Sequence, residues 1–440
     1  MQTSFRKLFL AVVLLMMTVS TACAENYPYR SDFLWVTTPD HADWLYKTGE
    51  KASVEVQLYK YGVPQNAEIS YTISRDMLEP ESSGKAALKN GRVVVKMGTR
   101  REPGFLDLKL TAKINGATTS HHVKVGFSVD KIMPYTKEPA DFTAFWQKEM
   151  DALKSLPLRN TINPAHEYDT DKADAYLVRL EVNKQRQCIY GYLFIPKAHK
   201  KGACPIVICP PGAGVKTIKE PLRHRYYADN GCIRFETEIH GLDPRMTEKQ
   251  FKEISTALNT GVNGYLCQGL DSRDNYYMKH VYLGLVRAID FLTSLPEWDG
   301  RNVAVQGGSQ GGALSLVLAA LDSRITLCCA NHPALADMAA YREKGRTGGY
   351  PHMHRIGVLN DTAEKTLQYY DVVNFARHIK CPVCMTWGYN DNTCPPTTSY
   401  AVWNVLKCPK SSLITPINEH WTSEATEKAH CDWILSNLIK

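Results

Sequence analysis

The N-terminal part of the chain alternates apolar and polar positions with a period of two. Val54, Val56 and Leu58 show the pattern, which is typical of strands with one buried face. Asn-Gly pairs at 90–91 and 115–116 separate such runs, and this dipeptide favours hairpins because both turn positions need a positive φ. About six short strands here predict a small β-sandwich domain over residues 25–131. It carries no visible catalytic group, so we interpret it as a packing module, with a carbohydrate- or partner-binding face as the alternative.

From residue 132 onward, apolar strands alternate with amphipathic helices. One helix is predicted to follow Asp141 as its N-cap, and a second helical stretch covers Tyr276 to Leu295. Continuous apolar strands between helices are typical of a mostly parallel sheet covered on both faces. We therefore predict an α/β domain over residues 132–440. Its expected strands are 189–195, 204–209, 232–239, 303–306, 325–330, 381–387 and 412–416, with a helix over 312–321.

Residues 1–24 predict a signal peptide. Arg6 and Lys7 precede an apolar run over 8–19, and Ala22-Cys23-Ala24 fits the small-residue cleavage pattern. The run is shorter than the roughly 20 residues that span a bilayer, which disfavours a membrane anchor. Ser20 disfavours lipid attachment at Cys23, because a bulky aliphatic residue is wanted there. We expect cleavage after Ala24 and a secreted or periplasmic protein with no membrane contact.

The composition of the chain limits the classes of partner and cofactor to be considered. A formal net charge of +7 on 440 residues, with no basic run, does not indicate a nucleic-acid partner. Many of the 13 cysteines lie in apolar runs, where cysteine acts as a small buried hydrophobe, so a dense disulfide framework is not expected. Cys381-Pro-Val-Cys384 lacks a second Cys or His pair at metal-ligand spacing. We expect neither a metal nor another cofactor.

The strongest chemical motif is Gly307-Gly308-Ser309-Gln310-Gly311, between a predicted strand and a helix rich in Ala and Leu. A nucleophile elbow holds its serine on a tight strand-to-helix turn, where flanking side chains would clash. The turn also aims backbone N–H groups and the helix N-terminus at the reacting oxygen. This context predicts Ser309 as the nucleophile of an α/β-hydrolase fold.

A serine hydroxyl needs a base to take its proton and a carboxylate to orient that base. In this fold the acid and then the base follow the serine along the chain. Asp391 comes just after the strand 381–387 and His420 just after the strand 412–416, so we predict that they complete the triad. The competing residues are less suitable by position: His430 in the terminal helix, His332 after the next strand, and Asp361 and Asp371 in an expected cover segment rather than at a strand end. Residues 331–361, which lie between the strands 325–330 and 381–387, are expected to cover the active site.

The motifs resemble those of the acetylxylan esterase and cephalosporin C deacetylase family, carbohydrate esterase family seven, from about Pro134 to the C-terminus. The resemblance implies removal of acetyl groups from acetylated xylan fragments and other small acetate esters, by a Ser–Asp–His triad without a metal. It rests on Asp141-Phe-xx-Phe-Trp, on Tyr276-Tyr277 before a helix ending Leu295-Pro296-Glu297, on Gly307-Gly-Ser-Gln-Gly-Gly312, and on Gly388-xx-Asp391-xx-Cys394-Pro-Pro.

The chain departs from the family pattern at three places. His240-Gly241-Leu242 stands where the family commonly has Arg-Gly-Gln, and Pro211-Gly212-Ala213 where it has His-Gly-Tyr. Glu419 precedes His420 and Trp421 follows it, where the family commonly has a Glu after the histidine. With these changes, the backbone N–H groups of Ala213 and Gln310 are the expected oxyanion hole. Pocket shape and any homo-oligomer contacts stay open.

Two other enzyme functions remain open on the same elbow: an esterase of longer acyl chains and a serine peptidase. A function of another class, an inactive carbohydrate-binding protein, is disfavoured by the intact order of the three triad residues. The natural acetylated substrate is not determined by the residues.

Overall fold

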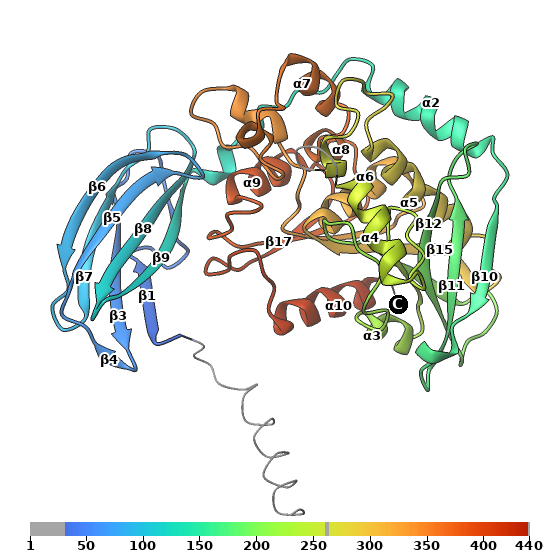
Figure 1. Ribbon diagram of the computed structural model, residues 1–440, viewed down its shortest axis with the longest axis horizontal. Helices are drawn as coiled ribbons and strands as arrows, with labels where there is room; N and C mark the ends of the chain where they lie inside the picture. Colours follow the sequence, from blue (N-terminus) through green and yellow to red (C-terminus); the bar gives the residue numbers. More distant parts are fainter. Residues whose placement is uncertain (1–30, 260–263, 439–440) are drawn as a thin grey trace, which may run out of the picture.

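The computed structural model describes residues 31–259 and 264–438, so the predicted signal peptide lies outside the described residues. The chain forms a small all-β part, blue in Figure 1, and a larger α/β part. Among the described residues, no helix combines the length and the apolar character that crossing a membrane would require.

The β part contains two sheets that enclose one core. One sheet has the order β1-β3-β4 with β7 also paired to β3, and the other has the order β2-β9-β8-β5-β6. Val54 and Val56 of the first sheet and Leu108 and Val125 of the second are fully buried in the same apolar cluster. The strands are β1 (Phe33–Pro39), β2 (Leu45–Tyr46), β3 (Ala52–Lys60), β4 (Val63–Pro64), β5 (Glu68–Arg75), β6 (Pro80–Ala87), β7 (Arg92–Gly98), β8 (Gly104–Ile114) and β9 (Ala117–Phe127).

Only one of the two Asn-Gly pairs connects strands that pair with each other. At 115–116 the pair joins β8 and β9 into an antiparallel hairpin, with Ile114 opposite Ala117. At 90–91 both residues also have positive φ, yet β6 pairs with β5 in one sheet while β7 pairs with β3 in the other. The expected hairpin at 90–91 is therefore wrong beyond the turn itself. A turn fixes a local chain reversal, whereas strand pairing depends on packing against distant neighbours.

The α/β part is built on a nine-stranded sheet of order β10-β11-β12-β14-β13-β15-β16-β17-β18. The pairs from β14 to β18 are parallel, and β10, β11 and β12 add an antiparallel edge. This mostly parallel sheet confirms the expected fold class. Its strands are β10 (Asn160–Pro164), β11 (Ala173–Glu181), β12 (Cys188–Pro196), β13 (Cys204–Cys209), β14 (Ile233–Thr237), β15 (Trp298–Gly308), β16 (Leu327–Asn331), β17 (Val383–Trp387) and β18 (Lys410–Ile414).

Helices cover both faces of this sheet (Figure 1). Alternation along β13 shows the division: Ile206 and Ile208 pack in the cluster with α5 and α6, whereas Val207 and Cys209 pack with α3 and α10. The helices named here are α2 (Phe142–Lys154), α3 (Arg225–Asp229), α4 (Glu248–Leu258), α5 (Met278–Leu292), α6 (Gln310–Leu321), α7 (Asp361–Leu367), α8 (Val372–Ala376), α9 (Pro396–Val405) and α10 (Glu424–Leu438).

Two local expectations need correction. Asp141 precedes α2 but caps no backbone N–H group, because its carboxylate binds Arg273 at 2.7 Å and the Tyr369 hydroxyl instead. Cys381 and Cys232 lie just before β17 and β14 rather than inside them. The twelve cysteines of the described residues are all unpaired, and those inside the central strands are buried, as expected of small apolar side chains.

Candidate active site

Ser309 lies on a sharp turn between β15 and α6. Its backbone adopts φ 58° and ψ −122°, a conformation that residues other than glycine rarely adopt. A Cβ atom at Gly307 would lie 2.5 Å from the Gly311 backbone, and one at Gly311 would lie 2.4 Å from the Pro210 carbonyl oxygen. One at Gly308 would meet only ordinary contacts, the nearest at 3.5 Å. The glycines at 307 and 311 are therefore required by close backbone approach, whereas the glycine at 308 is not.

The structure brings Ser309, His420 and Asp391 together. His420 Nε2 lies 3.0 Å from Ser309 Oγ, and His420 Nδ1 lies 2.8 Å from Asp391 Oδ2. The three residues follow β15, β17 and β18, which are parallel strands, so all three side chains meet at the carboxyl edge of the sheet. This arrangement can pass a proton from the serine to the imidazole while the carboxylate fixes the imidazole tautomer.

Asp391 is fully buried, and both of its carboxylate oxygens have hydrogen-bond partners. Its Oδ1 accepts backbone hydrogen bonds from Thr393 at 2.7 Å and Cys394 at 2.8 Å, so Oδ2 is left for His420. The backbone N–H groups therefore fix which oxygen faces the imidazole. This orientation follows from the backbone just after Asp391, where the N–H groups two and three residues along the chain are directed at the carboxylate.

The two expected oxyanion donors lie on segments that touch each other. Gln310 is the first residue of α6, where backbone N–H groups have no partner within the helix and the helix dipole favours negative charge. Ala213 lies in the loop after β13, whose Pro210 carbonyl contacts Gly311. The Tyr265 hydroxyl links the two segments, because it donates to Gln310 Oε1 at 2.6 Å and accepts from the Gly214 N–H at 3.2 Å.

His240, which stands where the family commonly has arginine, also supports this loop. Its Nε2 lies 3.2 Å from the Gly214 carbonyl oxygen and its Nδ1 lies 2.7 Å from the Tyr277 hydroxyl. Burial lowers the pKa of His240 to about 4, so the ring is neutral near pH 7 and donates from one nitrogen only. His240 thus forms a neutral hydrogen-bond bridge between Tyr277 and the loop after β13.

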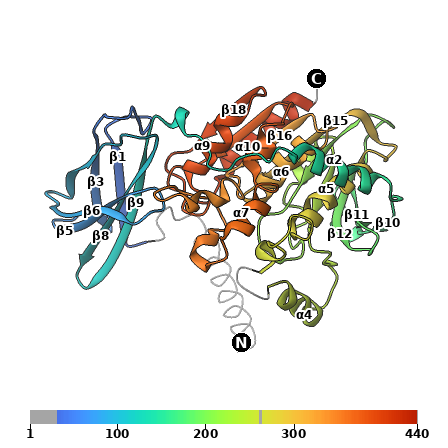
Figure 2. The same ribbon diagram turned by 90° about the horizontal axis from the view of Figure 1, so that it is seen from above.

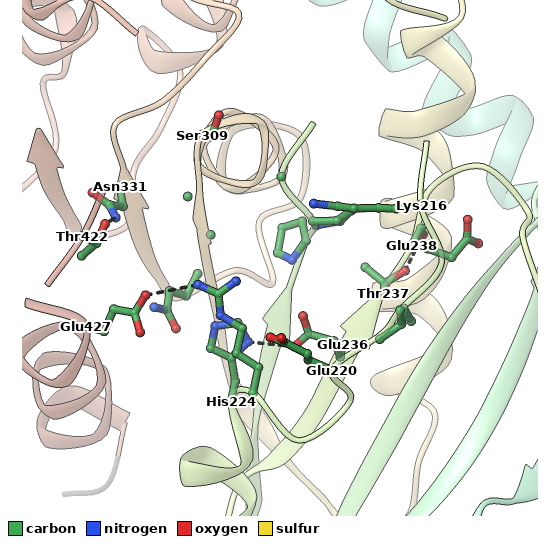
Figure 3. A pocket seen from close by; sticks show the side chains of 18 of the residues that line it. Lys216, Glu220, His224, Glu236, Thr237, Glu238, Ser309, Asn331, Thr422 and Glu427 are labelled. Carbon is green, nitrogen blue, oxygen red and sulfur yellow. Dashed lines mark hydrogen bonds and ion pairs between the residues drawn. The ribbon is translucent and has the colours of Figure 1, made fainter. Parts of the chain in front are cut away.

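A pocket of about 370 Å³ borders the nucleophile. Its walls carry many charged groups, including Lys216, His224 and Glu236, and Ser309 lies at its rim (Figure 3). The serine hydroxyl points away from the interior of this pocket in Figure 3. The pocket therefore adjoins the elbow, and His332, whose ring packs beside that of His420, forms part of its wall.

The segment 331–361 was expected to cover the site. Only Asn331 and His332 from this segment line the pocket beside Ser309. Farther along, Ala334 donates its N–H to the Ser309 carbonyl at 3.0 Å, and His352 Nε2 lies 3.0 Å from the Thr393 carbonyl. The segment therefore binds the backbone at Ser309 and the backbone just after Asp391, and it does not close over this pocket.

The other candidate residues are placed elsewhere. His430 is buried in α10 and lies 2.6 Å from the Thr386 hydroxyl. Asp371 is the N-cap of α8, and Asp361 lies in α7 with an exposed carboxylate. His332 packs beside His420 with ring centroids 4.4 Å apart, and burial lowers the pKa of His332 to about 4. The sequence position of His332, just after β16, does not predict this contact with His420.

Two groups of side chains in the described residues are close enough to be considered as metal ligands. One consists of His332, Asp391 and His420, whose last two members already bind each other and Ser309. The other consists of Cys209, His224 and Glu236, but Glu236 already forms an ion pair with the Arg234 guanidinium, which would repel a metal cation. His352, two residues before His354, has protein partners at both ring nitrogens.

We expect dialysis against EDTA to leave esterase activity unchanged, because both candidate groups found in the described residues contain members that are already engaged with protein partners. The measurement is initial-rate hydrolysis of p-nitrophenyl acetate before and after dialysis. A loss of activity that zinc or another divalent metal restores would contradict this expectation.

Comparisons with known proteins agree with this fold and identify the family. The family model described as acetyl xylan esterase matches residues 127–437. An acetyl esterase of Xylanibacter ruminicola, Axe7A, is 58% identical over 433 residues, which cover 98% of this chain and 97% of that protein.

Two solved structures are similar over the α/β part. An acetyl xylan esterase from Paenibacillus sp. R4 has a TM-score of 0.61 at 27% identity, covering 70% of this chain and 98% of that one. Acetyl xylan esterase 1 from Thermoanaerobacterium sp. JW/SL YS485 has a TM-score of 0.60 at 23% identity, covering 71% and 98%, and shows the shared fold. The chain belongs to the acetyl xylan esterase family and is a carboxylic ester hydrolase.

Proposed function

We propose that this enzyme removes acetyl groups from acetylated xylo-oligosaccharides and other small acetate esters through an acyl-enzyme intermediate. The observation that carries the mechanism is the position of His420, with one ring nitrogen 3.0 Å from Ser309 Oγ and the other 2.8 Å from Asp391. The family and its 58% identical relative, an acetyl esterase, support the acetyl group as the acyl part.

In the first half-reaction, Ser309 Oγ attacks the acetyl carbonyl while His420 Nε2 takes the hydroxyl proton. The carbonyl oxygen becomes negative and is bound by the N–H groups of Gln310 and Ala213. His420 then returns the proton to the leaving sugar oxygen as the C–O bond breaks, which leaves an acetyl-serine. Asp391 stays ionised and stabilises the imidazolium.

In the second half-reaction, water attacks the acetyl-serine while His420 again acts as the base. Collapse of the second tetrahedral intermediate transfers the proton back to Ser309 Oγ and releases acetate. No metal or other cofactor takes part in the proposed sequence.

We also propose that the enzyme is exported, with cleavage after Ala24. The support is the layout of residues 1–24, a basic start followed by a short apolar run and an Ala-x-Ala pattern. Mass spectrometry of the mature chain tests this proposal, because a chain that keeps Met1 would contradict it.

The test of the named function is a series of p-nitrophenyl esters with acetyl, butyryl and octanoyl groups. We expect kcat/KM to fall steadily along the series, because each methylene that a fitted pocket rejects costs about 1–3 kcal/mol of transition-state binding. All esters share one leaving group, so the comparison isolates the acyl part. If octanoyl esters were the better substrates, the deacetylase function would fail while the serine-hydrolase mechanism would stand.

The natural substrate needs a second measurement, the release of acetate from acetylated xylo-oligosaccharides compared with other acetylated sugars. We expect the xylo-oligosaccharides to be hydrolysed with the higher kcat/KM. Equal or faster release from unrelated acetylated sugars would remove xylan from the proposal without affecting the acetyl preference.

A further inference from the structure

The β part of the chain touches the loop that carries Asp391. Figures 1 and 2 both show the β part beside α9, the helix that begins just after this loop. Lys124, on β9, is fully buried at this junction. Its Nζ lies 2.8 Å from Asp76 Oδ1 and donates at 2.8 Å to the main-chain carbonyl of Asp391. A buried ammonium of the β part therefore binds the backbone of the proposed catalytic acid directly.

The same strand also binds the residue before the acid. The backbone N–H of Lys124 donates to Asn390 Oδ1 at 2.9 Å. On the other side, Asn390 Nδ2 donates to the Ile417 carbonyl at 3.3 Å, and the Asn390 N–H donates to the Asn418 carbonyl at 3.1 Å. Ile417 and Asn418 belong to the loop that ends in His420. Asn390 thus connects β9, the acid loop and the loop of the base.

Asp76, the partner of Lys124, binds the far end of the acid loop. Its Oδ2 accepts from the Thr397 hydroxyl at 2.6 Å and from the Thr397 N–H at 3.3 Å. The ion pair therefore holds the segment 391–397 at both ends, with Lys124 on the first residue and Asp76 on the last. The buried charges compensate each other, and each of the two side chains also binds this segment.

A second pair of the β part lies beside the first. His122 Nδ1 lies 3.1 Å from the buried carboxylate of Asp107, and its Nε2 lies 3.4 Å from Asn392 Nδ2 and 3.7 Å from Glu419. Asn392 follows Asp391, and Glu419 precedes His420. The contacts of the β part thus converge on the immediate neighbours of both the acid and the base.

We propose that Lys124 is a positioning residue for catalysis, and that the β part is a structural component of the active site rather than an independent module. Lys124 touches neither substrate nor reacting atoms. It fixes the backbone of Asp391, and hence the distance and direction of the carboxylate from His420. The inference rests on the proposed triad.

The comparisons agree with a contribution specific to chains that carry the β part. The family model begins at residue 127, after Lys124, and the two solved family structures match about 70% of this chain while being themselves almost fully covered. The acetyl esterase of Xylanibacter ruminicola, in contrast, matches 98% of the chain. The shared catalytic domain alone does not supply the Lys124 and Asp76 contacts.

The experiment uses the full chain with the double substitution Lys124→Met and Asp76→Asn, which removes the ammonium without leaving an unpaired buried carboxylate. We measure kcat and KM on p-nitrophenyl acetate, normalised to the fraction of protein labelled at Ser309 by a fluorophosphonate probe. We expect kcat to fall about 10- to 100-fold with KM within about twofold, because misplacement of a catalytic group by about 1 Å can cost about 10²-fold. The rate of fluorophosphonate labelling should fall by the same factor.

The matched control is Lys85→Met with Glu68→Gln, an exposed ion pair of the same β part at 2.7 Å. We expect its kcat, KM and labelling rate to equal those of the wild type. If the Lys124 variant does not fold, Asn390→Ser provides the same readouts, because it breaks the bridge between β9 and the two loops while keeping the ion pair.

A melting temperature that falls while kcat per labelled site stays within twofold of the wild type would overturn the proposal, because Lys124 would then only hold the two parts together. A wrong nucleophile is recognised separately: in that case the wild-type enzyme itself would not be labelled at Ser309.

Discussion

Replacing Ser309 by alanine should lower kcat on p-nitrophenyl acetate by about 10⁴-fold or more, because triad enzymes without their nucleophile keep only the catalysis of substrate binding and oxyanion stabilisation. Removal of Oγ leaves His420 and Asp391 in place, and alanine keeps the Cβ atom that the turn already accommodates. The fold should therefore be unchanged. The measurement combines steady-state kinetics with circular dichroism and a melting curve of the same preparation.

Ser323→Ala is the matched control, because Ser323 is exposed just beyond the other end of α6. We expect wild-type kinetics from it. If Ser309→Ala kept more than about a tenth of the wild-type kcat on this ester, the nucleophile would have to lie elsewhere.

Replacing Asp391 by asparagine should lower kcat by about 10⁴-fold, the effect of the same change in a serine protease triad. The structure gives the reason. Two backbone N–H groups, from Thr393 and Cys394, bind Oδ1 and would hold the asparagine oxygen in that position. The amide NH₂ would then face His420 Nδ1 and force the ring proton onto Nε2. That nitrogen could no longer accept the proton of Ser309.

Asp361→Asn is the control for this change, because the Asp361 carboxylate is 82% exposed and follows the nucleophile in the chain as Asp391 does. It should leave kcat within about twofold, as exposed ion pairs contribute little to stability. A comparable loss in both variants would assign the effect to general destabilisation. A loss confined to Asp361→Asn would move the acid to α7.

The elbow was predictable from sequence because its constraints are local. The strand before Ser309, the helix after it and the glycines at 307 and 311 are all within a few residues, and a Cβ atom at either glycine would lie less than 3 Å from backbone atoms. The placement of Asp391 and His420 beside Ser309 was predictable from their order and from the strands before them. Parallel strands bring their carboxyl ends to one edge, so residues that follow different strands meet there.

The turn at 90–91 is a feature for which local sequence patterns did not predict the strand pairing. Its positive φ angles are a property of Asn and Gly and were anticipated, but β6 and β7 leave it for different sheets. The edge strands β10 and β11 were likewise not anticipated, and the Asp141 carboxylate is drawn away from its helix by Arg273 and Tyr369. In each case a partner distant in sequence outweighs the local preference.

The sequence by itself determined the α/β class, the elbow at Ser309 and the order of Asp391 and His420, because these depend on hydrophobic periodicity, glycine sterics and chain direction. Only the tertiary structure decided what surrounds the triad. Tyr265 and His240 reach the oxyanion loop from elsewhere in the chain, and Lys124 reaches Asp391 across 267 residues. No local pattern marks these residues, since a buried lysine or tyrosine acquires its role from the partner that folding places beside it.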